Sequence, residues 1–354
     1  MKILMLVNWK IHYLNTDNIA IQPPDKVVKG TPYWIFKYWP ENVIVDVVDY
    51  SKLPLFHALE KEILKFYAWQ AIVAAFKSRN YDMIISHGAQ SGILLAFLRA
   101  LCGNRNPPHF IIDIGCFNGA RENLFETMPI EFASRTLAGI IYHSSIQRKY
   151  YQRHFPTIVK RTIFVPFGVD VEFFAPGNGE IDDVVVSFGY QKRDYETLLK
   201  AWRGLKGVKT ELRIIGIKNS GICSLKNNSG DIKFFDFVPI SELKRIIAAS
   251  RFVVIPLPYF EYCYGQMSLL QSMSMGKAVI VTKTPSTQDY VVNGRNGFFV
   301  DPYDVNGLHG KLEFLLKNPN SAKDIGDRAH RDVREKFSEE LMTRRIYNFL
   351  KVFK

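Results

Sequence analysis

A glycine placed before a helix is the first arrangement in this sequence that could do chemistry. Gly265 ends an aromatic loop that follows an apolar run, and residues 266–275 favour a helix. A glycine lets a ligand approach backbone amides closely, and the positive end of the helix dipole favours a phosphate there. The pattern therefore predicts an anion site in which Gly265 and the backbone amides of Gln266 and Met267 contact the ligand.

A cation follows the end of another apolar run. Arg193, with Lys192 beside it, comes shortly after Gly189. A guanidinium at this place could neutralise the charge that develops on a departing diphosphate. The alternative is an exposed arginine at a helix start that pairs with Asp194 or Glu196.

Polar residues also follow two apolar runs in the N-terminal half. The string IISHGAQSG places His87 and Gly88 after one run, and FIIDIGCFNGARE places Asp113 and Asn118 after another. The carboxyl ends of parallel strands meet at one edge of a sheet, so both loops are predicted to line a ligand site. The alternative for Asp113 is a cap on a loop or helix.

Other chemistry has no signal in the sequence. There is no Asp-x-Asp pair, HExxH, Walker loop, GxGxxG or GxSxG, and the eight histidines are dispersed. We therefore expect neither a metal nor a resident cofactor. Four cysteines without a CxxC pair argue against a disulfide framework and favour a reducing, cytoplasmic compartment.

Two series of short apolar runs, separated by segments of helical period, must position these residues. The first series predicts strands at residues 3–7, 43–48, 83–86, 110–114, 139–142 and 162–165. The second predicts strands at residues 184–188, 212–215, 232–235, 252–255, 278–282 and 297–300. The clearest helix is predicted over residues 57–77, with Ile63 and Phe76 on its buried face.

This alternation indicates an α/β protein with two Rossmann-like domains. A stretch rich in Pro and Gly separates the two series. It divides the chain into an N-terminal domain, residues 1–168, a C-terminal domain, residues 169–335, and a C-terminal helix, residues 336–354, that packs back on the N-terminal domain.

Composition favours anionic partners. The 354 residues include 46 Lys and Arg against 34 Asp and Glu, a net charge of +12. Aromatic and basic residues mix in TPYWIFKYWP (residues 31–40) and in the helix after His57, which predicts peripheral contact with an anionic membrane; the alternative is that these aromatics are buried against the sheet. No nucleic-acid-binding module is visible, so nucleic acid is not an expected partner.

Several motifs together resemble one enzyme family. Tyr264 and Gly265 form an aromatic–glycine step, residues 272–274 read SMS, and Gly276 and Val279 follow. This string is similar to the donor-binding segment of retaining glycosyltransferases of the GT-B type, the large family-4 group with sucrose synthase-like and phosphatidylinositol mannosyltransferase-like enzymes. The strings VPFGVD and SFGYQKRDYETLLKAW, and NGRNG at residues 293–297, extend the resemblance over most of residues 162–304.

The resemblance implies a GT-B fold, with two Rossmann-like domains facing across a cleft. It also implies transfer of a sugar from a nucleotide-diphosphate-sugar, UDP- or GDP-linked, to an acceptor hydroxyl on a glycan or lipid, with retention of configuration. The acceptor is expected on the N-terminal domain and the donor on the C-terminal domain. The enzyme would be a metal-independent hexosyltransferase of the cytoplasm, peripheral on the inner face of the membrane.

The resemblance also assigns roles to single residues. It places Asp113 and Arg193 in catalysis. His87, Gly88 and Asn118 are expected on the acceptor side because they follow predicted strands of the N-terminal domain. The donor would contact Gly189, Lys192, Arg193, Tyr264, Gly265, Gln266, Met267 and Gln271, the last of these at the ribose. Glu261 would take the role of the family's first glutamate if the loop is reshaped; the alternative is a solvated charge on the loop. The sequence departs from the family at two glutamates, because Gln271 replaces one and Cys263 the other. A nucleotide-sugar epimerase or hydrolase, or an inactive sugar-nucleotide-binding scaffold, therefore stays an alternative.

Overall fold

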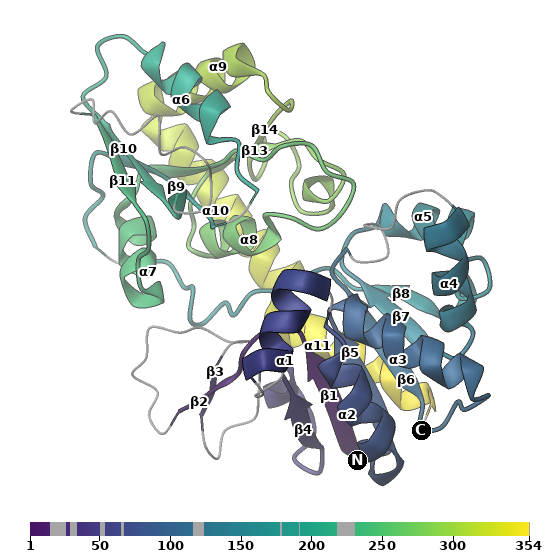
Figure 1. Ribbon diagram of the computed structural model, residues 1–354. Coiled ribbons are helices and arrows are strands. Elements are labelled where there is room, and N and C mark those ends of the chain that lie inside the picture. The colour runs from purple at the N-terminus through teal and green to yellow at the C-terminus, as the bar shows by residue number, and fades with distance from the viewer. Residues whose placement is uncertain are drawn as a thin grey trace. The chain divides into compact units, whose positions relative to one another are not determined.

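The computed structural model describes residues 1–14, 26–28, 34–49, 54–64, 67–115, 124–177, 179–190, 192–217 and 231–353. The chain divides into two units (Figure 1). The N-terminal unit comprises Met1–Pro166 together with Met342–Lys354, and the C-terminal unit comprises Phe167–Leu341.

Six parallel strands form the sheet of the N-terminal unit, in the order β4-β1-β5-β6-β7-β8. Apart from Lys2, the residues of the inner strands β1, β5, β6 and β7 are buried and mostly apolar, as expected of strands covered on both faces. Their bounds are β1 Lys2–Val7, β4 Ile44–Val48, β5 Met83–His87, β6 His109–Asp113, β7 Gly139–Tyr142 and β8 Thr162–Phe164. A separate parallel pair joins β2, His12–Leu14, to β3, Lys26–Val28.

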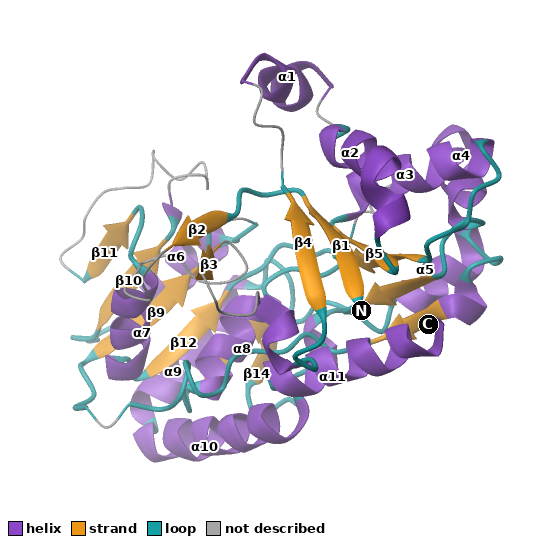
Figure 2. Cartoon of the chain, turned by 90° about the horizontal axis from the view of Figure 1, so that it is seen from below, coloured by secondary structure: helices purple, strands orange, loops and turns teal. Residues whose placement is uncertain are grey.

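Helices cover both faces of this sheet. On one face lie α2 Trp69–Lys77, α3 Ala89–Leu101, α4 Leu124–Ser134 and α5 Gln147–His154, and on the other lies α11 Glu339–Leu350, followed by η8 Lys351–Phe353 (Figure 2). Phe349 and Phe353 pack edge-on against Phe110. A Cβ on Gly139 would stand 2.8 Å from the Phe349 ring, so the glycine lets the C-terminal helix lie close to the sheet.

The single helix predicted over residues 57–77 is wrong. The structure has α1 Pro54–Ala58, the π-helical η2 Leu59–Leu64 and then α2, and both Ile63 and Phe76 are exposed rather than buried. The buried Glu60 carboxylate marks where α2 begins as a separate helix. Its Oε1 accepts hydrogen bonds from the backbone amides of Ala68 and Trp69, which have no partner within α2. Three short 3-10 turns complete the unit: η1 Trp34–Tyr38, η3 Ser78–Asn80 and η4 Val159–Arg161.

The C-terminal unit also has a six-stranded parallel sheet, in the order β11-β10-β9-β12-β13-β14. Its strands are β9 Val184–Phe188, β10 Glu211–Ile215, β11 Ile232–Phe235, β12 Phe252–Ile255, β13 Val279–Thr282 and β14 Phe298–Val300. Two parallel sheets with flanking helices confirm the predicted pair of Rossmann-like domains. None of the described helices has the length and hydropathy needed to span a bilayer.

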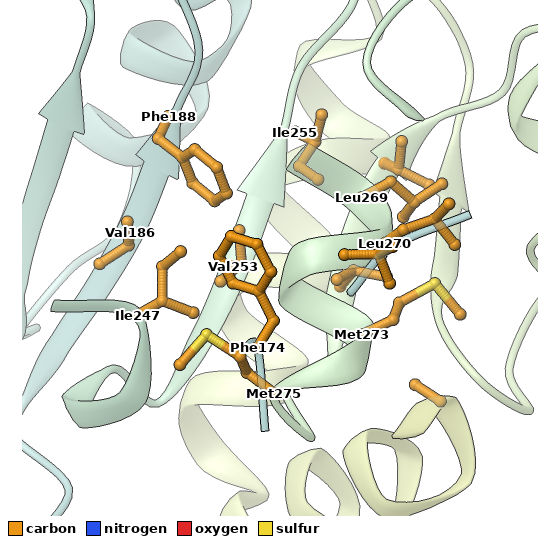
Figure 3. Packing of buried hydrophobic residues seen from close by; sticks show 14 of the residues in the cluster. Phe174, Val186, Phe188, Ile247, Val253, Ile255, Leu269, Leu270, Met273 and Met275 are labelled. Atoms are coloured by element: carbon orange, nitrogen blue, oxygen red, sulfur yellow. The ribbon is translucent and has the colours of Figure 1, made fainter. Parts of the chain in front are cut away.

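Two cores fix the helices of the C-terminal unit. On one face α7 Ile240–Ala249, α8 Gln266–Ser274 and α10 Pro319–Lys336 bury apolar side chains, and Figure 3 shows Leu269, Leu270 and Met273 of α8 packed beside Val253 and Ile255 of β12. On the other face α6 Tyr195–Arg203 and α9 Val305–Lys317 bury theirs. A 3-10 turn, η7 Thr287–Asp289, precedes β14. The packing of α8 sets where its first turn points.

Candidate functional site

The strand order of the C-terminal sheet changes direction between β9 and β12. From β9 the chain proceeds to β10 and β11 on one side, and it returns to β12, β13 and β14 on the other. Open α/β sheets bind ligands outside the carboxyl ends of the strands at such a switch point. The segments that follow β9 and β12 are the ones that contain Arg193 and Gly265.

Gly265 begins helix α8 in a conformation that suits glycine. Its φ is +82°, in the left-handed region, and a Cβ there would stand 2.8 Å from Leu257 Cδ1. The first intrahelical bond runs from the Leu269 amide to the Gly265 carbonyl at 2.9 Å. The amides of Gln266, Met267 and Ser268 precede it in the first turn, where they and the helix dipole can hold an anion.

The guanidinium of Arg193 bridges the two segments. Its Nε donates to the Phe188 carbonyl at 3.1 Å, and its Nη2 donates to Ser268 Oγ, in the first turn of α8, at 2.8 Å. Gly189 makes room for it, since a Cβ there would stand 2.1 Å from Nη2. Burial lowers the pKa of Arg193, so its charge is held in a place poor in water, where an anion would stabilise it.

The two acids that could have paired with Arg193 along the helix have other partners. Asp194 caps α6 by accepting a hydrogen bond from the Thr197 amide at 3.1 Å. Glu196 pairs with Lys200 at 2.7 Å. The arginine points instead toward the start of α8.

Gln266 places an amide at the same helix start. Its residue is only 5% exposed, and its Nε2 finds no hydrogen-bond partner among the described residues. A buried amide donor without a partner is costly, so such groups often mark a ligand site. Gln266 is therefore positioned to donate to a ligand oxygen.

An aromatic cluster borders this helix start. The rings of Phe260, Tyr262 and Tyr264 lie between 5.2 and 5.4 Å from one another. Lys192 Nζ lies 4.8 Å from the Phe260 ring and 6.0 Å from the Tyr264 ring, a cation–π geometry. The cluster connects the segment after β9 to the loop before α8 a second time.

The remaining predicted donor residues lie on the same loop and helix. Glu261 is exposed in the loop before α8, Met267 is 43% exposed on the first turn, and Gln271 is buried on the second. Thus the predicted residues of the C-terminal unit all belong to two adjacent segments at one edge of the sheet. Ser268, which joins them, was not predicted, because a serine inside a helix carries no local signal of a contact 75 residues away.

The predicted acceptor-side residues lie at the corresponding edge of the N-terminal sheet. His87 ends β5, is buried, and has the Trp9 ring 4.9 Å away in an edge-on geometry. Burial, with a contribution from His143, lowers the pKa of His87 to about 3, so the ring is neutral at physiological pH. Gly88 has φ +91°, and a Cβ there would stand 2.8 Å from Asn8 Nδ2. Asn118 lies outside the described residues.

Asp113 ends β6 with its carboxylate fully buried. One oxygen accepts a hydrogen bond from the Gly115 amide at 2.8 Å, and the other accepts from Gln147 Nε2 at 3.0 Å and from the Tyr151 hydroxyl. These bonds tie the loop after β6 to α5. These hydrogen bonds are those of a loop cap, which was the alternative to a catalytic role for Asp113. The catalytic role of Asp113 stays a prediction.

No three His, Cys, Asp or Glu side chains of the described part of the chain group into a cluster that could hold a metal ion. The arrangement at α8 instead offers amides, a guanidinium and a buried side-chain amide. These are groups that bind phosphate oxygens directly.

Comparison with known proteins agrees with this geometry. Residues 178–332 match the family described as glycosyl transferases group 1. This segment is therefore similar to the group 1 glycosyltransferases. The match contains both segments of the site and confirms the resemblance predicted from the sequence.

The curated relatives of this chain are distant. The capsular polysaccharide biosynthesis glycosyltransferase CapM of Staphylococcus aureus is 26% identical over 100 residues, which is 28% of this chain and 26% of CapM. The alignment thus spans about a quarter of that relative.

Solved structures resemble the whole chain. Sucrose-phosphate synthase of Thermosynechococcus elongatus has a TM-score of 0.75 at 15% identity and covers 99% of both chains. Anabaena Alr3699/HepE, solved in complex with UDP, has a TM-score of 0.73 at 14% identity and covers 99% of this chain and 100% of its own. These likenesses establish the GT-B fold.

Proposed function

We propose that this protein is a glycosyltransferase that moves a sugar from a nucleoside-diphosphate sugar to an acceptor hydroxyl. The observation that carries the proposal is the hydrogen bond between Arg193 and Ser268 at the switch point of a group 1 domain. It directs a buried positive charge to the start of a helix whose amides can hold a diphosphate.

Each part of the site has a task in this reaction. The amides of Gln266 and Met267 would hold the diphosphate, and Arg193 would stabilise the negative charge that grows on it as its bond to the sugar breaks. Lys192 would add a second positive charge, and Gln271 would accept a hydrogen bond from the ribose. The transfer breaks the bond from the sugar to the diphosphate and forms one to the acceptor oxygen, whose proton must leave.

The donor and acceptor are named by class. HepE, a structural neighbour, was solved with UDP and with UDP-glucose, which supports a UDP-sugar ahead of a GDP-sugar. CapM belongs to capsular polysaccharide biosynthesis, which supports a glycan or lipid-linked glycan acceptor. The acceptor would enter beside His87, Gly88 and Asp113. The cytoplasm as location, and retention of configuration, rest on the sequence and its family resemblance.

Nucleotide binding is the first test. Thermal unfolding should shift upward by a few degrees with UDP or GDP at about a hundred times its dissociation constant, since such a ligand adds about 2.7 kcal/mol. Arg193→Ala should abolish the shift. Arg203→Ala, an exposed arginine at the end of α6, is the matched control and should keep it. No shift in the wild-type protein would remove the basis of the proposal.

A second assay, which follows consumption of the nucleotide sugar with and without acceptor, distinguishes a transferase from an epimerase or hydrolase and from an inactive scaffold. A transferase consumes the nucleotide sugar only when acceptor is present and releases the nucleoside diphosphate in equal amount. An epimerase or hydrolase would change the nucleotide sugar without any acceptor. A scaffold would bind the nucleotide and turn nothing over with any acceptor tested.

A further inference from the structure

One side of the N-terminal unit exposes large apolar side chains on three neighbouring helices. We call Ile72 and Phe76 of α2, Leu98 and Leu101 of α3, and Phe125 and Met128 of α4 the apolar row. Phe76 is 83% exposed and Phe125 is 93% exposed. Single exposed apolar residues are ordinary, but a row of this kind on adjacent helices marks an interaction surface.

Topology places these side chains on one surface. The chain passes from β4 to β5, β6, β7 and β8 in one direction across the sheet, so right-handed crossovers put α2, α3, α4 and α5 on the same face. The packing agrees: α2 and α3 bury Ala74 and Leu95 against Leu4, and α3 and α4 bury Ala96 and Ala133 against Ile111. The six side chains of the apolar row are exposed, so they lie away from the sides of the helices that pack on the sheet. Figure 2 shows α2, α3 and α4 next to one another.

The segment beside this row is strongly basic. Residues 132–166, which include the end of α4 and all of α5, contain six Lys and Arg and no Asp or Glu. Arg135, Arg148, Lys149, Arg153 and Lys160 are exposed. Thr157, after α5, donates a 2.6 Å hydrogen bond to Glu131 of α4, so this basic segment lies alongside the apolar row.

We propose that the apolar row and the basic segment together bind the surface of an anionic lipid bilayer. The apolar side chains would enter the boundary between headgroups and acyl chains, and the basic segment would contact lipid phosphates. Charge disfavours a second copy of the chain as the occupant, because a two-fold contact would bring two acid-free basic segments to one interface.

This surface shares Phe76 with the helix after His57 that the sequence indicated, but it does not include the other indicated stretch. In the aromatic stretch at residues 31–40, Phe36 and Trp39 are buried, and the Trp39 indole donates to the Thr343 carbonyl of α11 at 3.0 Å. Those rings hold the C-terminal helix and belong to the core. The proposal also stands apart from the nucleotide site, because every residue of the apolar row belongs to the N-terminal unit.

The test is co-sedimentation of the full chain with vesicles. The wild-type protein should bind vesicles of equal parts phosphatidylglycerol and phosphatidylcholine, and should bind pure phosphatidylcholine far less. Phe76→Ser with Phe125→Ser should lower the partition coefficient at least about tenfold. The matched control, Ile44→Ser with Ile181→Ser, removes exposed apolar side chains elsewhere and should bind as the wild type does.

The basic segment has its own pair of variants. Arg148→Glu with Lys149→Glu should lower binding to the anionic vesicles by at least about thirtyfold, since two basic residues that attract the lipid phosphates are replaced by acidic ones. Lys206→Glu with Lys209→Glu, equal in charge change and exposed on the C-terminal unit, should not.

Three results would overturn the proposal. They are equal binding to neutral and anionic vesicles, wild-type binding by the double serine variant, and no vesicle binding at all. A dimer that the serine variants convert to monomers, measured by light scattering, would assign the surface to a second copy instead. The nucleotide-induced thermal shift should be intact in all these variants, so failure here and failure of the nucleotide site give different results.

Discussion

Arg193 Nη2 and Ser268 Oγ lie 2.8 Å apart and join segments that are separated by 75 residues in the sequence. The bond fixes the guanidinium over Gly189 and in front of the first turn of α8. A positioned charge loses little freedom when an anion binds, so the contact prepares the site before the ligand arrives.

Ser268→Ala should weaken nucleoside-diphosphate binding. The variant keeps the charge of Arg193 but removes its hydrogen-bond acceptor, and a bond to a charged group contributes about 1.5 kcal/mol or more, so the dissociation constant should rise about tenfold. Titration calorimetry measures it. Ser272→Ala is the control, because the Ser272 hydroxyl donates to the Ser268 carbonyl inside the helix. Equal losses in both variants would show that the helix, and not the arginine, is affected.

Gln266→Leu should have opposite effects on stability and on binding. The variant replaces a buried amide whose Nε2 has no partner among the described residues, so the free protein should gain about 1 kcal/mol in the free energy of unfolding. Nucleotide affinity should fall, because the amide would no longer donate to the ligand. Urea unfolding without ligand and calorimetry with ligand give the two values. A less stable variant with full affinity would contradict the assignment of Gln266 to the site.

Gly265→Ala should damage the same helix start through its backbone. The substitution meets both a left-handed φ of +82° and Leu257 Cδ1 at 2.8 Å, and we expect a loss of about 2–4 kcal/mol in the free energy of unfolding.

The matched control is Gly294→Ala. Gly294 has a similar φ of +77° but nothing within 4 Å of an added Cβ, so only the conformational cost of about 1 kcal/mol applies. Thermal or urea unfolding of both variants isolates the steric part. Equal losses would mean that close packing at Gly265 does not matter.

The strands could be predicted because their signal is local. Buried parallel strands such as β9 and β12 are short apolar runs bounded by turn residues, and each of the twelve predicted strands overlaps a strand of the two sheets. The helix predicted over residues 57–77 is wrong because apolar residues at helical spacing need not be buried. Ile63 and Phe76 have that spacing and are exposed.

The site could be predicted only where the signal in the sequence is local. Gly265 and Arg193 are recognisable from the segments around them, since each follows a strand at the switch point. Two contacts of the site join distant segments: Arg193 with Ser268, and Lys192 with Phe260. Neither segment alone contains a pattern that predicts them. The buried environment of Asp113 likewise depends on Tyr151, which lies 38 residues further on.

Asp332 gives the fourth prediction, on stability and pH. Its buried carboxylate accepts hydrogen bonds from Arg295 at 2.7 Å, Lys336 at 2.6 Å and Asn296 at 2.9 Å, which tie the loop before β14 to α10. Burial alone would raise the pKa of Asp332, but these hydrogen bonds outweigh it and the pKa lies below its ordinary 3.8. Asp332→Asn should therefore lower the free energy of unfolding at neutral pH by about 3 kcal/mol.

The pH dependence follows from the direction of that shift. A carboxyl whose pKa is lower in the folded state contributes its full stability above the unfolded value and loses it as the pH falls through the folded value. The difference between wild type and Asp332→Asn should thus be constant from neutral pH to about 5 and should shrink below about 4. Asp327→Asn breaks an exposed pair with Lys323 and should cost less than about 1 kcal/mol. Urea unfolding across this pH range measures the difference in the free energy of unfolding between wild type and Asp332→Asn. A difference that grows on acidification would contradict the lowered pKa of Asp332.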